Sequence, residues 1–247
     1  MADDQSNNPR ASDFFADHLN ELRKRIFLCL SVLIVLAVGC YFISDQIYFF
    51  LTQPIRGLSQ KLYFLEPYGA FAVKLQITLL SALFFAAPLL LTEIWLFVAP
   101  GLYTKEKKAV SLLMAVSIFL FVAGCALAFF AVVPFAIRFF LGFSTPDLQP
   151  IISIQQYMEF VAWLSLGFGA AFQAPIFLIG LVWLGVVKTA QINMMRPYVI
   201  VGLFVFAALL TPPDPLTQCL LAIPLWGLFE VSYWITKVIG TRKKRSD

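Results

Sequence analysis

Residues 23–42 read RKRIFLCLSVLIVLAVGCYF, three cations followed by seventeen residues that carry no charge. A helix of seventeen residues is about 26 Å long, close to the hydrocarbon thickness of a bilayer. Basic residues at the end of such a run hold that end on the cytoplasmic side. The stretch therefore predicts a transmembrane helix that starts in the cytoplasm.

Five more apolar runs follow, at residues 73–99, 109–133, 160–187, 198–210 and 216–235. The chain is 60% hydrophobic and 13% charged, whereas a soluble domain is about half apolar and about a quarter charged. We therefore predict an all-α polytopic membrane protein with six spans. Its membrane domain would cover residues 26–236, between a cytoplasmic segment at 1–25 and a basic tail at 237–247.

The basic residues are divided unequally between the two sides of these runs. Four of the eighteen fall in the predicted external loops, namely Arg56, Lys61, Lys74 and Arg138. The other fourteen fall on the opposite side, which predicts that both termini are cytoplasmic. Residues 1–10 are polar and include two aspartates, unlike a cleaved signal peptide. A bacterial inner membrane is the expected location.

Two segments outside the runs are also expected to be ordered. Phe15, Leu19, Leu22 and Ile26 recur at helical spacing, which predicts an amphipathic helix over residues 12–25 on the cytoplasmic surface. The first external loop, residues 44–72, is the longest and rich in tyrosine and phenylalanine. Such aromatic side chains favour an interfacial cap.

The fifth run, residues 198–210, would form only about 20 Å of helix. Either the bilayer thins beside it or residues 193–197 extend it by a turn; the predicted bundle has short fifth and sixth helices. Pro88, Pro175 and Pro224 lie inside apolar runs. Proline bends helices, which favours a concave, cupped bundle.

The sequence offers little for catalysis, and we predict neither a cofactor nor a metal. No nucleotide, zinc or nucleophile motif occurs, and the single histidine, His18, precedes the first run. An acid-based hydrolase using Glu93 or Glu230 is a distant alternative, and a secondary transporter for a small solute is the main one. The cysteines lie unpaired in apolar runs and are expected to be buried thiols: Cys29, Cys40, Cys125 and Cys219.

Two glutamates stand among cations on the predicted cytoplasmic side. Glu21 lies in HLNELRKR at residues 18–25, and Glu106 lies in APGLYTKEKK at residues 99–108. Glu21 and Arg25 are spaced as an ordinary i, i+4 ion pair, and Glu106 has the simple alternative of a solvated loop charge.

These two motifs, together with TPPD at residues 211–214, resemble the TatC family, the core subunit of the twin-arginine protein translocase. The resemblance implies a receptor for the Arg-Arg signal peptides of folded proteins. It implies that Glu21 and Glu106 bind the arginine pair, with Arg23, Leu19 and Phe97 beside them. Guanidinium groups favour bidentate pairing with carboxylates, which agrees with that role.

The resemblance also implies TatA-like and TatB-like single-span partners beside residues 198–235, export driven by the proton gradient, and self-association within a larger complex, without nucleic acid. Gln173 would face the concave groove, although hydrogen bonding between helices is an alternative for each polar residue inside the bilayer. The expected groove or partner contacts are Gln173, Asp214, Gln218, Glu230 and, in the external loop, Pro54.

Overall fold

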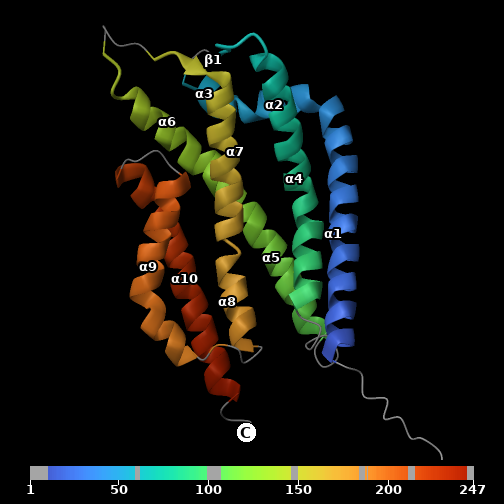
Figure 1. Cartoon of the computed structure of the whole chain (residues 1–247). Coiled ribbons are helices and arrows are strands. Elements are labelled where there is room, and N and C mark those ends of the chain that lie inside the picture. The colour runs from blue at the N-terminus through green and yellow to red at the C-terminus, as the bar shows by residue number, and fades with distance from the viewer. Residues whose placement is uncertain are drawn as a thin grey trace, which may run out of the picture.

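The computed structural model of the chain describes residues 11–58, 62–98, 107–145, 150–183, 187, 189–210 and 215–243, and it is almost entirely helical (Figure 1). The elements, in chain order, are α1 (Ala11–Phe42), α2 (Ser44–Leu51), α3 (Gln53–Arg56), β1 (Leu62–Tyr63), α4 (Gly69–Val98), α5 (Lys107–Leu127), the π-helix η1 (Ala128–Val132), α6 (Val133–Leu141), β2 (Ile152–Ser153), α7 (Ile154–Ala171), α8 (Ala174–Trp183), α9 (Thr189–Leu210) and α10 (Pro215–Lys243).

Each predicted apolar run coincides over most of its length with helix, which confirms the all-α polytopic class. Among the described residues, five segments are long and apolar enough to cross a bilayer: Leu19–Phe42, Gly69–Phe97, Ser111–Leu141, Ile154–Val182 and Gln191–Leu209. The sixth run lies inside α10, whose 29 residues make about 44 Å of helix. That length exceeds the roughly 30 Å of a hydrocarbon core.

The prediction of short fifth and sixth helices is wrong. Helix α9 has 22 residues and α10 has 29. Residues 193–197 are helical and extend α9 toward its N-terminus. This is the second of the two alternatives that the sequence left open for the fifth run. Met194, Met195 and Arg196 form helices readily, and the helix continues through Pro197 into the apolar run.

The predicted amphipathic surface helix is the first part of α1 and not a separate element. Helix α1 runs without interruption for 32 residues, because residues 19–25 contain no glycine or proline to break it. In the most apolar stretch of α1, only 6% of the residues are buried inside the protein. The helix packs mainly against α4. Most of α1 therefore faces the lipid, and α4 holds it in place (Figure 1).

The described residues of the loop predicted to be external, 44–58 and 62–72, are ordered, as predicted. Helices α2 and α3 and strand β1 form a cap at one end of the bundle, and β1 pairs in parallel with β2 (Figure 1). The Arg56 guanidinium stacks 3.9 Å from the centroid of the Phe49 ring. The buried Tyr157 hydroxyl of α7 donates a 2.7 Å hydrogen bond to the Leu51 carbonyl in the last residue of α2.

Tyr157→Phe is expected to destabilise this cap by about 1–2 kcal/mol, because a carbonyl at a helix end loses its buried donor. Faster amide hydrogen exchange in α2 and α3 would measure the effect. Tyr198→Phe is the control, since Tyr198 is 76% exposed. Equal exchange in both variants would contradict the stabilising role of the Tyr157 hydroxyl.

The core lies where α5 crosses α7, and the crossing depends on two glycines. A Cβ on Gly124 would stand 2.8 Å from the Phe168 carbonyl oxygen, and one on Gly169 would stand 2.7 Å from the Cys125 sulfur. Helix α5 slants across the upright α7 and α8 (Figure 1), and Val161, Leu164 and Phe168 are fully buried in the core. The glycines let the helices approach closely enough to bury these side chains.

Prolines interrupt two of the long helical segments. The π-helix η1 precedes Pro134, which lacks the N–H that would continue the α-helical ladder. Helices α7 and α8 are separated by a turn at Phe172 and Gln173, just before Pro175. The predicted bend at Pro175 is confirmed, and the break brings the Gln173 side chain into the protein interior.

Candidate functional site

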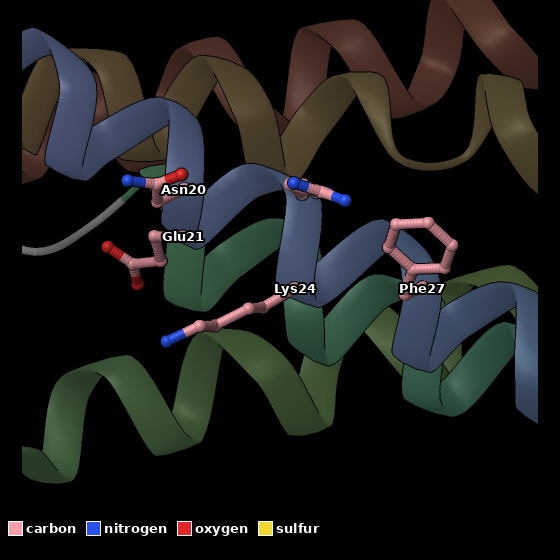
Figure 2. Close-up of a pocket in the computed structure, with 5 residues that line it drawn as sticks. Asn20, Glu21, Lys24 and Phe27 are labelled. Carbon is pink, nitrogen blue, oxygen red and sulfur yellow. The ribbon is translucent and has the colours of Figure 1, made fainter.

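A hollow of about 730 Å³ lies along the N-terminal part of α1, at the end of the bundle opposite the cap (Figures 1 and 2). Its lining includes Asn20, Glu21, Arg23, Lys24 and Phe27. Figure 2 shows the Glu21 and Lys24 side chains extending to the same side of α1. The hollow thus combines a carboxylate, an amide, two cations and an aromatic ring.

Arg25 joins Glu21 to Glu93 on α4. Its Nε and Nη2 donate to Glu21 Oε1 at 3.1 and 2.6 Å, and its Nη1 donates to Glu93 Oε2 at 2.5 Å. The side chains are 47% exposed for Glu21, 22% for Arg25 and 17% for Glu93. Two edges of one planar guanidinium therefore face two carboxylates, which an ammonium group could not do with the same geometry.

The other residues predicted for signal-peptide binding are found at the same end of the bundle, where the structure describes them. Leu19 is 49% exposed, and the Arg23 guanidinium lies 5.7 Å from the centroid of the Phe27 ring. Phe97 is partly buried near the end of α4. Glu106 lies outside the described residues.

Glu93 is the member of this cluster that sequence reasoning missed. We expected it as a polar group near the end of an apolar run, open to an interhelical bond, or as an acid of the alternative hydrolase, but not as part of the signal-peptide site. The available signal was an acidic residue in the last turns of that run, facing the same side of the membrane as Arg25. Its partner could not be assigned, because the two residues are 68 positions apart.

Gln173 is placed differently from the prediction that it faces the groove. Its side chain is 5% exposed and is hydrogen-bonded to α5. Ser117 Oγ donates to Gln173 Oε1 at 2.5 Å, Gln173 Nε2 donates to the Ser117 carbonyl at 3.0 Å, and Trp95 Nε1 donates to Ser117 Oγ at 3.2 Å. A buried amide needs partners for its polar atoms, and Gln173 finds them in Ser117. The side chain therefore joins the turn between α7 and α8 to α5.

The remaining predicted contact residues lie elsewhere. Glu230 accepts a 2.7 Å hydrogen bond from Arg196, and Gln218 Nε2 donates to the Phe204 carbonyl at 2.8 Å. Both contacts join α10 to α9. Pro54 lies in α3 within the cap, and Asp214 lies outside the described residues.

The chemistry of the described residues is that of charge pairing. Among them, no group of three His, Cys, Asp or Glu side chains is arranged to hold a metal ion. All four cysteines are free thiols. The expectation that all are buried is confirmed for Cys40 and Cys125; Cys29 is only partly buried, and Cys219 is exposed because its place on α10 faces outward.

The fold and this cluster define a polytopic α-helical membrane protein with an arginine–carboxylate site at one end of its bundle. The sequence model of the family described as Sec-independent protein translocase protein (TatC) matches residues 17–224. The chain belongs to the TatC family. It is therefore a component of a protein translocase.

Relatives and solved structures agree with this assignment. The chain is 38% identical to the TatC protein of Magnetococcus marinus, over 94% of this chain and 86% of that protein. It is 34% identical to TatC of Escherichia coli K12, over 93% and 91%. A crystal structure described as the twin-arginine translocase receptor TatC superposes with a TM-score of 0.81 at 34% identity, covering 89% of this chain and 99% of that one.

Proposed function

We propose that this chain is the signal-peptide receptor and core subunit of a twin-arginine translocase in a bacterial cytoplasmic membrane, with both termini inside. One observation carries the proposal. The Glu21 carboxylate accepts two N–H donors of a guanidinium, yet 47% of its side chain stays exposed beside a hollow of about 730 Å³. The site thus already uses the pairing that an arginine signal would require.

Two neighbouring arginines in an extended peptide point in opposite directions, so they require two separate carboxylates. We assign one to Glu21 and the other to Glu106. Leu19 and Phe27, 49% and 57% exposed, offer apolar surface for the flanking residues of the signal. Arg23 and Lys24 repel a basic peptide at long range, so they favour a guest that can form short bidentate bonds.

Partner subunits would bind along α9 and α10. Both helices expose large apolar side chains to the surroundings, including Tyr198, Leu209 and Ile223. A single-span TatA-like or TatB-like helix would pack against this face, with Gln218 and Glu230 as polar contacts. Asp214, which precedes α10 in the sequence, and Pro54, in the cap, are further proposed contacts. We also propose that copies of this chain associate within a larger complex and that the proton gradient drives export of the folded cargo.

Glu21→Gln is expected to weaken binding of a cargo that carries an Arg-Arg signal, because a neutral amide cannot pair with a guanidinium as a carboxylate does. The same cargo with a Lys-Lys signal should bind the unaltered protein about 1–3 kcal/mol more weakly, about 5- to 150-fold in Kd. Fluorescence binding to the purified protein in lipid nanodiscs would measure both effects.

Asp45→Asn is the matched control, since Asp45 is 89% exposed and lies at the cap end of the bundle. It should bind the Arg-Arg cargo as tightly as the unaltered protein. Equal Kd values for Arg-Arg and Lys-Lys signals would contradict the receptor role. Uptake of a small solute by the purified protein alone would instead support a transporter.

A further inference from the structure

We propose that Arg25 competes for Glu21 with an arginine of the signal peptide, called the guest arginine below. When the guest arginine binds Glu21, Arg25 stays paired with Glu93 alone. This inference rests on the proposed function. It adds Glu93 and Arg25 to the binding site as positioning residues, which act on the guest through Glu21.

The two halves of the Glu21–Arg25–Glu93 cluster are unequal. The half toward Glu93 is the more enclosed, with side chains 22% and 17% exposed. The half toward Glu21 reaches a carboxylate that is 47% exposed. Water screens an exposed ion pair more strongly than an enclosed one, so the bonds to Glu21 are the ones that exchange more readily.

The bonds of the cluster fit an exchange of this kind. Arg25 divides its guanidinium between two carboxylates, with Nε and Nη2 on Glu21 and Nη1 on Glu93. A guest guanidinium that displaces Arg25 from Glu21 would therefore leave the Nη1 bond to Glu93 in place. Arg25 would keep its bond to Glu93 and would not be left as an unpaired cation at a partly enclosed position.

The alternative is that the Arg25–Glu93 pair only fastens α1 to α4. Helix α1 has most of its packing against α4, so such a role has a clear structural basis. The two accounts differ in what happens when both partners are removed. If the pair only fastens α1 to α4, the double variant should bind the cargo as weakly as Glu93→Gln. If Arg25 competes for Glu21, removing Arg25 as well should restore binding.

The experiment uses the full-length protein in nanodiscs and a folded cargo that carries an Arg-Arg signal. Glu93→Gln is expected to raise the Kd about tenfold or more, because Arg25 then has only Glu21 to pair with. Arg25→Gln combined with Glu93→Gln should return the Kd to within about threefold of the unaltered protein. Arg25→Gln alone should bind the cargo at least as tightly as the unaltered protein.

Thermal unfolding of each variant identifies those that fold, and Arg25→Gln alone still tests the inference if Glu93→Gln does not fold. A double variant as weak as Glu93→Gln, or weaker binding by Arg25→Gln, would overturn the competitor role. If the unaltered protein does not prefer the Arg-Arg over the Lys-Lys cargo, the proposed function fails instead. Preference for Arg-Arg with no change in Kd for any variant rejects only this inference.

Discussion

Gly124→Leu is expected to lower the stability of the folded protein by about 3 kcal/mol or more. A Cβ at this position would stand 2.8 Å from the Phe168 carbonyl oxygen and 2.8 Å from the Phe172 ring. The oxygen belongs to the backbone of α7, so no side-chain rotation can relieve the clash, and α5 must move away. Extra methylene groups in a well-packed core cost about 1–3 kcal/mol and occasionally more, and leucine adds four carbons here.

The measurement is the apparent Tm of the purified protein in detergent. A loss of 3 kcal/mol corresponds to a fall of about 6–12 °C for a chain of this size. Gly202→Leu is the matched control, because nothing lies within 4 Å of a Cβ built on Gly202 in α9. Equal Tm values for the two variants would show that the α5–α7 crossing is looser than the structure indicates.

Gln173→Leu is the second large effect, with an expected loss of about 2–3 kcal/mol. The substitution keeps an apolar core position filled but removes the acceptor of the Ser117 hydroxyl and a donor to the Ser117 carbonyl. Buried polar atoms that lose their partners cost about 1–3 kcal/mol each, reduced where they find others. The apparent Tm should fall, with disorder at the turn between α7 and α8.

Two further variants make this test specific. Gln156→Leu changes an exposed glutamine on α7, the helix that precedes the turn, and should leave the Tm nearly unchanged. Ser117→Ala combined with Gln173→Leu should cost less stability than the sum of the two single changes. Each single change already breaks the hydrogen bond between the two side chains, so the double variant loses that bond only once. Additive losses would show that the two side chains act independently, against the hydrogen bonds described above.

Much of the fold could be predicted from local pattern. The apolar runs located the long helices because the bilayer requires about 20 apolar residues in each span. The bend near Pro175 could also be predicted from the proline itself, and the ordered cap from the aromatic residues of its own segment. The N-terminal end of α9 could not be predicted in this way, because a helix can continue beyond an apolar run through residues such as Met194, Met195 and Arg196.

The candidate site was less accessible to such reasoning. Glu21 stood out because an acid among cations before an apolar run is unusual, and its pairing with Arg25 follows from the i, i+4 spacing. Glu93 and Gln173 were visible as polar residues in apolar runs, but their partners lie 68 and 56 positions away. Which of these residues faces a hollow and which fills the core depends on how the helices pack.

The sequence by itself determined the membrane class and the helical segments, because hydrophobicity acts residue by residue against a bilayer of fixed thickness. Only the tertiary structure decided that Arg25 reaches two carboxylates and that Gln173 joins α7 and α8 to α5. Those contacts depend on where α5 crosses α7 and where α1 lies on α4. Both arrangements follow from the packing of segments that are distant in the chain.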